Sequence, residues 1–410
     1  MNPSRRRFLK STGLGFLALG LPPAFLVRAA EAQQAGRGKV MVVVFQRGAM
    51  DGLNAVIPFK DPVYYSLRQS IAIAEPASGE ERAIDLDGFY GLHPALAPLK
   101  SIYDKGHLAI VHAAGSPDNS RSHFDAQDYM EIGTPGIKNT PDGWLNRTLS
   151  DLSEMKKGPS PFRGVALTAQ LPRILAGAAP ALTLSSIDEF RLRSEAMAAT
   201  LQKLYTGTSD SLFRFGGESL FAAMAKLRQV ESKIPVSAER YPAGRFGTSL
   251  AQIARLIKAN VGLEIAFTEI QGWDTHVNQG GAKGQMANRL KDLAEGLATF
   301  YRDLGDRIGD VVVITLSEFG RTARENGNRG TDHGHGNVMF ALGGPVRGGK
   351  VYGRWPGLAP ELLYEGRDLD LTTDFRTVCS EVISAHLGQK ELAKIFPNFR
   401  PASEALGLIG

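Results

Sequence analysis

Long apolar runs recur along this chain and alternate with segments whose apolar residues have helical spacing. Apolar runs typical of strands buried on both faces of a sheet cover residues 39–45, 108–112, 263–270, 310–316 and 338–342. Helical spacing predicts helices at 96–103, 120–131, 286–308 and 375–387, and Thr373 with Asp374 caps the last one. This alternation indicates an α/β fold, a three-layer α/β/α sandwich around a mostly parallel central sheet.

The middle of the chain has a different pattern. Residues 150–260 contain no histidine, and amphipathic stretches at 191–205 and 220–230 are separated by segments with proline and glycine. We therefore predict a helical insertion or cap at 150–260, within a single α/β domain that spans residues 33–410.

The N-terminus has the features of an export signal. Residues 4–10 read SRRRFLK, an apolar stretch follows at 13–27, and Ala30-Glu31-Ala32 is a small-x-small cleavage site. We predict a twin-arginine signal peptide at residues 1–32, recognition by the twin-arginine translocation machinery, and a periplasmic location. An uncleaved anchor is the alternative, although the stretch is short for a membrane span and contains Pro22 and Pro23.

Charge and cysteine content narrow the possible partners. The formal net charge is +5, but the predicted signal carries five basic residues and one acid, so the rest of the chain is close to neutral. Such a balance gives no reason to expect a nucleic-acid partner. Cys379 is the only cysteine, which excludes an intrachain disulfide and a thiolate metal cluster. It lies in an apolar helical pattern, as a buried structural thiol would.

The strongest chemical signal is the run GTDHGHG at residues 330–336. Imidazole and carboxylate are the ligand types that suit zinc and similar divalent metals, and glycines let the backbone approach closely. Further acids and histidines occupy the turns at 46–52, 272–276 and 317–322, where the edge of a parallel sheet would gather them. Together they form a pool of candidate metal ligands: Asp51, Asp274, His276, Glu318, Asp332, His333 and His335.

Spacing supports this interpretation. Asp274 and His276 are two residues apart, as are His333 and His335, so each pair shares a face if its segment is extended. We predict one or two divalent ions, with zinc favoured and calcium or magnesium as alternatives. The competing interpretation is a set of surface loops with capping acids and solvated histidines. Glu318, in particular, suits the first turn of a helix equally well.

Other polar side chains allow two interpretations each. Arg321 could bind an anionic group or pair with Glu318, and Arg47 beside Asp51 has the same ambiguity. Ser120 and Ser122 open a predicted helix, where a serine can be a nucleophile facing free N–H groups or simply a cap. Of the other histidines, His93 and His112 are expected to be structural, and the helix dipole explains His386.

Several motifs taken together resemble a known family. They are the twin-arginine start, RGAMDG at 47–52, SHFD at 122–125, GWL at 143–145, GWDTH at 272–276, SEFGRT at 317–322 and DHG at 332–334. This set looks like the exported family called domain of unknown function 1501, over essentially the whole chain after the signal. That family is similar to the alkaline phosphatase and sulfatase superfamily, α/β hydrolases that bind one or two divalent metals at the ends of the strands.

The resemblance implies roles for particular residues. Asp51 matches the acid after the first strand, Ser122 or Ser120 the nucleophile, and Asp274 with His276 an Asp/His pair. Glu318 takes the place of a second aspartate, and His333 or His335 could supply a late histidine.

Departures from the superfamily pattern bear on the metal and on the chemistry. Phe319 stands where the superfamily has a histidine, which favours one ion rather than two, or none. A Cys-x-Pro-x-Arg motif is absent, so formylglycine sulfatase chemistry is not expected. The expected function is an exported, metal-dependent hydrolase of phosphate or sulfate esters, acting on a small anionic ester or an envelope polymer. The alternative is a catalytically silent binding or assembly protein of the cell envelope that retains the fold.

Overall fold

The computed structural model describes residues 37–77, 79–155, 160–187, 237–401 and 405–410, together with residues 203, 221 and 222. The predicted signal peptide at 1–32 lies outside the described residues. So do the predicted helices at 191–205 and 220–230, apart from those three isolated positions. Within the described ranges, none of the helices combines the length and the apolar character needed to cross a membrane.

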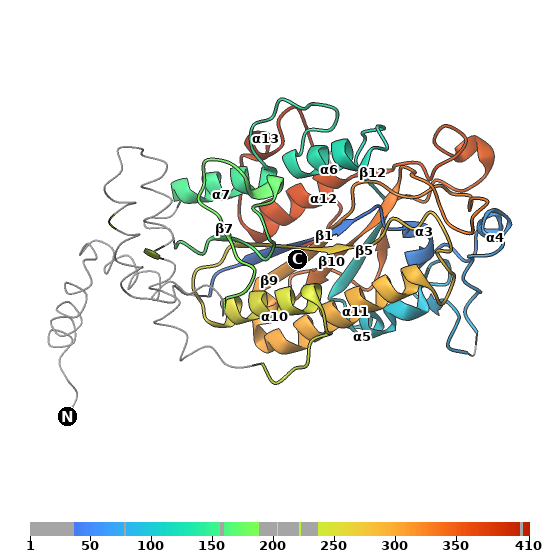
Figure 1. Ribbon diagram of the computed structural model, residues 1–410, viewed down its shortest axis with the longest axis horizontal. Coiled ribbons are helices and arrows are strands. Elements are labelled where there is room, and N and C mark those ends of the chain that lie inside the picture. Colours follow the sequence, from blue (N-terminus) through green and yellow to red (C-terminus); the bar gives the residue numbers. More distant parts are fainter. Residues whose placement is uncertain are drawn as a thin grey trace.

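Within the described residues, a nine-stranded sheet forms the centre of the structure (Figure 1). Its order is β11-β5-β10-β9-β1-β8-β6-β7, and β12 also pairs with β5. The long strands are β1 (Val40–Arg47), β5 (Leu108–Gly115), β8 (Ile265–Gln271), β9 (Val311–Leu316) and β10 (Asn337–Gly343), and the short ones are β6 (Gly164–Ala166), β7 (Leu182–Thr183), β11 (Val351–Tyr352) and β12 (Thr373–Asp374).

Strand direction decides where the connecting loops lie. β10 runs antiparallel to β5 and β9, and the other pairings in this sheet are parallel. The turns that follow β1, β5, β8 and β9 therefore lie at one edge of the sheet. Because β10 is reversed, the segment that precedes it reaches that same edge. The loop at 330–336 precedes β10 and therefore lies at the same edge as the turns that follow the parallel strands.

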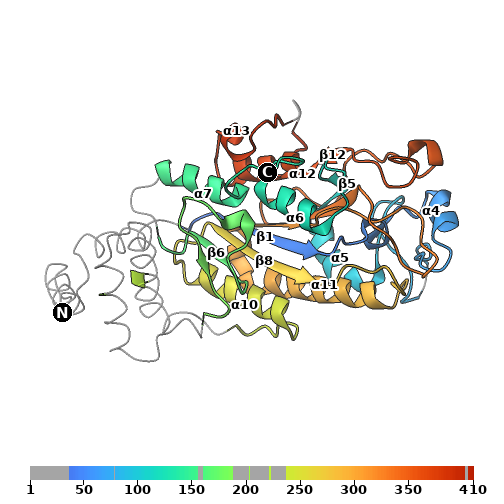
Figure 2. The ribbon, with the colours of Figure 1, turned by 45° about the horizontal axis from the view of Figure 1, so that its top comes forward.

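Helices cover both faces of the sheet (Figure 2). On one face lie α5 (Ala97–Asp104), α10 (Arg245–Lys258) and α11 (Gln285–Leu304), and on the other lie α6 (His123–Ile132), α7 (Trp144–Met155), α12 (Phe375–Glu381) and α13 (Leu392–Ile395). This arrangement confirms the predicted three-layer α/β/α sandwich with a mostly parallel sheet.

The alternation of side chains along β1 explains why both faces are covered. Val42 and Val44 belong to the hydrophobic core that includes residues of α5, α10 and α11. Met41, Val43 and Phe45 point the other way, into a second core that includes residues of α7 and α12. Every residue from Met41 to Phe45 is fully buried, so this strand separates two apolar cores.

Much of the predicted secondary structure is confirmed, with differences at the helix ends. The five predicted strands correspond to β1, β5, β8, β9 and β10. The helix expected at 286–308 is α11, which ends at Leu304 because Gly305 adopts a positive φ of 51° and a 3-10 turn follows. The helix expected at 375–387 is α12 followed by a π-helical turn at Val382–His386.

Parts of the segment expected as an insertion lie in the sandwich itself. β6 pairs with β8, β7 extends the sheet beyond β6, and α10 packs against α11. β6 has only three residues, too few for an apolar run to indicate a strand. The described portions of 150–260 therefore complete one end of the sheet and one helical layer.

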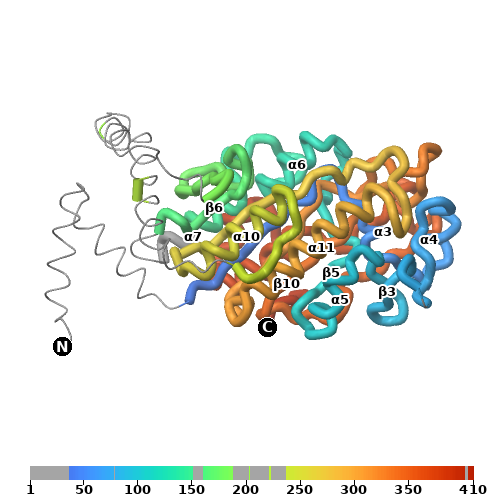
Figure 3. Tube along the Cα trace, turned by 60° about the horizontal axis from the view of Figure 1, so that its bottom comes forward, coloured from blue at the N-terminus to red at the C-terminus, as the bar shows by residue number. Residues whose placement is uncertain are grey.

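A small subdomain lies beside the edge where β1 ends (Figure 3). It consists of α3 (Gly52–Ala55), α4 (Pro62–Leu67) and a three-stranded antiparallel sheet of β2 (Val56–Ile57), β3 (Ile84–Asp85) and β4 (Gly91–Leu92). Leu53, Ile57 and Tyr64 belong to a buried cluster that also includes Ala113 of β5 and Leu369, so the subdomain is a packed extension of the domain.

Candidate metal centre

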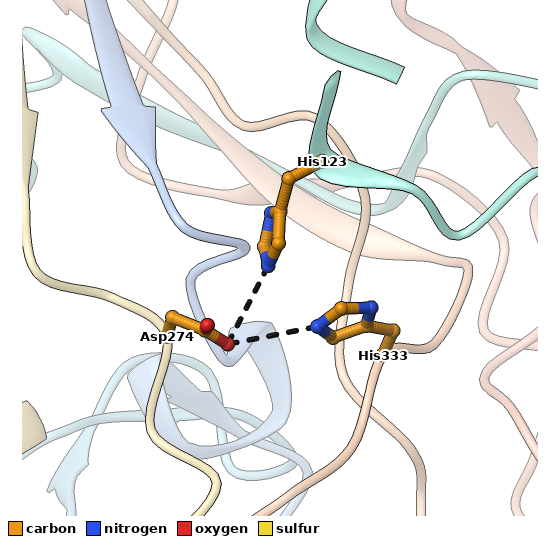
Figure 4. A group of neighbouring side chains, drawn as sticks. All are labelled: His123, Asp274 and His333. Carbon is orange, nitrogen blue, oxygen red and sulfur yellow. Dashed lines mark ion pairs between the residues drawn. The ribbon is translucent and has the colours of Figure 1, made fainter. Parts of the chain in front are cut away.

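Four side chains from three separate segments meet at the carboxyl edge of the sheet. Asp274 and His276 follow β8, His123 is the first residue of α6, and His333 lies in the loop before β10. Asp274 Oδ1 is 3.4 Å from His123 Nε2, 3.0 Å from His276 Nε2 and 3.6 Å from His333 Nε2. His123 and His333 thus face the same carboxylate from two sides (Figure 4).

The other nitrogen of each ring faces an acceptor. Nδ1 of His123 lies 2.8 Å from a Glu318 oxygen, and Nδ1 of His276 lies 2.9 Å from an Asp332 oxygen. Nδ1 of His333 lies 2.8 Å from the backbone oxygen of Arg121. Carboxylates and carbonyls only accept hydrogen bonds, so each Nδ1 carries the proton. A neutral ring then presents an unprotonated Nε2, and such outer contacts are typical of metal-binding histidines.

This donor set fits a divalent cation. The Nε2 atoms of His276 and His333 are 3.0 Å apart. When both rings are neutral and protonated at Nδ1, neither Nε2 has a proton to donate to the other. Only a positively charged ring or a shared cation makes such a contact favourable. Ligand atoms of His123, Asp274 and His333 all lie within 4.8 Å of one another, and His276 Nε2 adds a further nitrogen. The group close enough to share one ion therefore holds two imidazoles and one carboxylate, ligand types that suit zinc and similar divalent metals.

The pKa shifts have identifiable causes. Burial lowers the pKa of His333, and the positive charge of Arg321, with that of His123 when its ring is protonated, adds to the effect. The hydrogen bond to Glu318 raises the pKa of His123, so protons compete more strongly at that ring. Burial would raise the pKa of Asp274, but the hydrogen bond and charge of Arg321 leave it lowered, and this carboxylate stays ionised.

Glu318 supports the site from behind. It is fully buried, and its Oε1 accepts hydrogen bonds from Gln127 Nε2 (2.7 Å) and Gly48 N (2.8 Å) in addition to that from His123. Burial would raise its pKa, but the hydrogen bonds from His123 and Gln127 leave the pKa lowered. Glu318 therefore lies in the outer layer, as a buried carboxylate that orients the His123 ring.

Asp332 makes a similar contact closer to solvent. Its Oδ1 accepts from Asn326 Nδ2 at 3.0 Å and from His276 at 2.9 Å. The hydrogen bond from Asn326 is the main reason that its pKa is lowered. Its side chain is 55% exposed, so this contact is weaker support than the one from Glu318.

Arg321 joins the loops together. Its guanidinium donates to the backbone oxygens of Ala49 (2.7 Å), Gly48, Thr331 (3.0 Å) and Trp273 (3.1 Å), and to Asp274 Oδ1 (2.7 Å). Its side chain is fully buried. Of the two interpretations from sequence, the ion pair is present, but its partner is Asp274.

Arg47 is also engaged with protein groups. Its guanidinium contacts Glu269 Oε2 at 2.6 Å, Glu131 Oε1 at 2.8 Å and Gln127 Oε1 at 2.9 Å. Arg47 and Arg321 therefore both have their charge balanced by acids of this chain.

Asp51 lies in a separate network. Its Oδ2 is 2.6 Å from Arg68 Nη1 and 2.7 Å from Gln279 Nε2, and both partners of the ion pair are buried. It occupies the N-cap position of α3. The structure thus gives Asp51 a buried cation as its partner and does not place it in the histidine cluster.

His335 is also placed elsewhere. Its ring is buried and stacks on Tyr364, with centroids 4.2 Å apart, whereas the His333 ring contacts His123 and His276. The two histidines, which would share a face only in an extended segment, lie in different surroundings, and His333 is the one in the cluster. Gly334 packs against the Arg321 backbone so closely that a Cβ would lie 2.3 Å from the Arg321 carbonyl carbon.

The two serines lie beside the cluster. Ser122 is the N-cap of α6 and accepts the Asp125 N–H at 3.4 Å, and Ser120 Oγ accepts the Ser122 N–H at 3.5 Å. Ser122 directly precedes His123. The capping interaction is present, and a nucleophilic role for either serine stays a prediction.

Phe319 forms one wall of the cluster. Its buried ring lies 4.9 Å from the His123 ring and 5.0 Å from the His333 ring, measured between centroids. Phe319 thus packs against the rings of two clustered histidines.

Sequence reasoning missed His123. The motif SHFD was noted for its serine, and a single histidine at a helix start has no ligand partner nearby in the sequence. His123 lies in the segment that follows β5. This position could have placed it at the same edge of the sheet as the other polar turns.

The chain shows weak overall similarity to several solved structures. The C-terminal periplasmic domain of EcEptC from Escherichia coli in complex with Zn is 8% identical, with a TM-score of 0.36, covering 76% of this chain and 74% of that one. PsFucS1 sulfatase from Pseudoalteromonas sp. is 11% identical, with a TM-score of 0.38, over 95% and 76%. The lipoteichoic acid synthase LtaP from Listeria monocytogenes is 8% identical, with a TM-score of 0.25, over 75% and 65%.

Sequence comparison is more decisive. No curated protein sequence matches this chain. The sequence model of one family, described as "Protein of unknown function (DUF1501)", matches residues 107–386, a span that includes all four clustered side chains. The chain therefore belongs to the DUF1501 family.

Proposed function

We propose that this protein is an exported, metal-dependent hydrolase of phosphate or sulfate esters or related anionic substrates. The observation that carries the proposal is the approach of His276 Nε2 to His333 Nε2, 3.0 Å apart, while both Nδ1 atoms face acceptors. Two unprotonated nitrogens facing each other are costly without a cation between or beside them.

The proposed ligands are His123, Asp274 and His333, with His276 as a fourth. Three nitrogen donors favour zinc over calcium and magnesium, which prefer oxygen. A divalent cation bound there supplies Lewis-acid polarisation of an ester oxygen.

The chain's own residues would prepare the site for this chemistry. Arg321 keeps Asp274 ionised, and Glu318 orients His123. The side chains of Asp274 and His276 are 47% and 38% exposed, so a substrate can reach them. Ser122 lies at the N-terminus of α6, where free N–H groups favour an anionic group. We assign the attack on the ester to the hydroxyl of Ser122 or Ser120: the phosphate or sulfate group passes to the serine oxygen as its bond to the alcohol oxygen breaks, and the alcohol leaves with the serine proton. Water then hydrolyses the serine ester, which releases phosphate or sulfate and restores the hydroxyl.

Anion recognition needs positive charge. Because Arg47 and Arg321 bind acids and carbonyls of the protein, we assign this role to the cation and to the first N–H groups of α6. The substrate would be a small anionic ester or an envelope polymer, reached after export through the twin-arginine signal at residues 1–32.

Metal content and hydrolysis together test the proposal. The purified protein is stripped with a chelator and reloaded with zinc, and bound zinc is measured by mass spectrometry. Hydrolysis of p-nitrophenyl phosphate and p-nitrophenyl sulfate is followed before and after reloading. We expect about one zinc per chain and activity that returns with it. Stoichiometric zinc without hydrolysis would favour a silent binding protein, and no zinc at all would refute the metal site.

Variants separate this site from other histidines. His333→Ala and Asp274→Ala should each lower zinc affinity at least about 100-fold, since each removes a ligand. His107→Ala is the matched control, because His107 pairs with Tyr301 at the opposite edge of the sheet and should leave zinc binding unchanged. A comparable loss in His107→Ala would mean that zinc binds elsewhere.

A further inference from the structure

Asp368 is a buried carboxylate that lies between two arginines. Its side chain is 0% exposed, and its Oδ2 accepts from Arg121 Nε at 3.0 Å and Arg121 Nη2 at 2.7 Å. The Arg367 guanidinium donates to the same carboxylate, with Nε 3.0 Å from Oδ1 and Nη2 3.1 Å from Oδ2. Such two-point contacts fix the planes of both guanidinium groups.

Both arginines also hold His333. The backbone oxygen of Arg121 accepts the Nδ1 proton of His333 at 2.8 Å, and Arg367 Nη2 donates to the backbone oxygen of His333 at 2.7 Å. One arginine thus sets the ring, and the other sets the backbone to which the ring is attached. Asp368 is the group that both arginines share.

The backbone of Arg121 shows why an anchor is needed. Arg121 has a φ of +49°, a left-handed conformation that is unfavourable for a residue with a side chain. This conformation directs its carbonyl oxygen at His333. Strained backbone persists where the surroundings hold it, and the two bonds from the Arg121 side chain to Asp368 do so.

We propose that Asp368 is a positioning residue for His333. By holding Arg121 and Arg367, it keeps the proton of His333 on Nδ1 and leaves Nε2 facing Asp274. This inference rests on the proposed metal site, because it assigns Asp368 the task of presenting one ligand of that site.

The first test needs no metal. In metal-free protein with ¹⁵N-labelled histidine, ring-nitrogen NMR reports which nitrogen of His333 carries the proton. We expect the Nδ1–H form in the wild type and a mixture of both neutral forms in Asp368→Asn. Glu365→Gln is the matched control, because Glu365 contacts the same Arg121 Nη2 at 2.7 Å but is 51% exposed, and it should leave the spectrum unchanged. An unchanged His333 signal in Asp368→Asn would overturn the inference.

The second test uses zinc alone as the probe. Asp368→Asn should weaken zinc binding about 10–100-fold, as changes in outer hydrogen-bond partners do. In a His333→Ala background the same substitution should have no further effect. An equal loss in both backgrounds would show a general structural role and refute positioning.

A second variant is used if Asp368→Asn does not fold. Arg121→Lys then replaces it, since lysine keeps the charge but loses the two-point contact with Asp368. The same NMR and zinc results are expected from that variant. If the wild type binds no zinc while Asp368→Asn changes the proton position on His333, the positioning role stands and the metal-dependent function fails.

Discussion

The Nη2 of Arg321 donates to Asp274 Oδ1 over 2.7 Å, at the oxygen that all three histidine Nε2 atoms approach. The same guanidinium binds backbone oxygens in the turns after β1 and β8. One buried cation therefore fixes a carboxylate and also the loops that carry it. The ionised state of Asp274 and the conformation of the turns after β1 and β8 therefore depend on the same side chain.

Replacing Arg321 should destabilise the whole edge of the sheet. Arg321→Met leaves several backbone acceptors without their donor, so we expect the free energy of unfolding to fall by about 3 kcal/mol or more. Urea unfolding followed by circular dichroism measures this. Arg324→Met is the control, because Arg324 is exposed three residues away. Equal stability of the two variants would show that the Arg321 contacts contribute little.

Glu318 and Asp332 should differ in importance although each contacts a histidine Nδ1. Glu318→Gln changes a buried acceptor with three partners and should weaken zinc binding about 10–100-fold. Asp332→Asn changes a 55% exposed acceptor and should cost less than about tenfold. Isothermal titration with zinc measures both. The reverse order would show that burial does not decide the strength of these contacts.

Asp51 should affect stability more than metal binding. Asp51→Asn leaves the buried Arg68 guanidinium without its counter-charge, so a loss of about 3–5 kcal/mol in unfolding free energy is expected. Zinc affinity of the folded variant should change less than about threefold, because Asp51 contacts Arg68 and Gln279. A loss of zinc binding at unchanged stability would instead identify Asp51 as a ligand.

His112 gives a prediction for pH. Its Nδ1 accepts the Ala113 N–H at 2.9 Å and its Nε2 lies 3.0 Å from the Val56 oxygen, an arrangement that suits only the neutral ring. Burial lowers its pKa from 6.5 to about 4. Between pH 6.5 and pH 4 the His112 ring is protonated in the unfolded chain but neutral in the folded protein. The free energy of unfolding therefore falls as the pH drops from 6.5 towards 4.

The variant His112→Gln isolates this contribution. Glutamine keeps a donor for the Val56 oxygen but does not titrate, so unfolding free energy should fall by about 3 kcal/mol less than in the wild type over that pH range. Urea unfolding at pH 7 and pH 4 provides the comparison. Parallel pH curves for the two proteins would exclude His112 as the source.

The fold could be predicted from the sequence because its signal is local. Five apolar runs and their intervening helical patterns are enough to indicate the layered sheet. β6 and β7 were missed because strands of three and two residues carry no periodic signal and depend on pairing with β8 and with each other.

The site was predicted less completely, for a geometric reason. Asp274 and His276 could be paired from sequence because they are neighbours. The sequence does not show which of His333 and His335 faces them, and His123 joins them only because β5 and β8 run parallel in the same sheet. Such contacts depend on the tertiary structure, and the spacing of residues along the chain does not reveal them.

The position of β1 has a consequence for synthesis. β1 is made first, yet it pairs with β8 and β9, whose residues follow more than 200 positions later. At ~5–20 residues per second, the segment VMVVVF waits on the order of 10–40 s or longer for its partners. An unpaired, uncharged β-branched segment of this kind is prone to aggregate. The nascent chain would therefore benefit from a holding chaperone until β9 emerges from the ribosome.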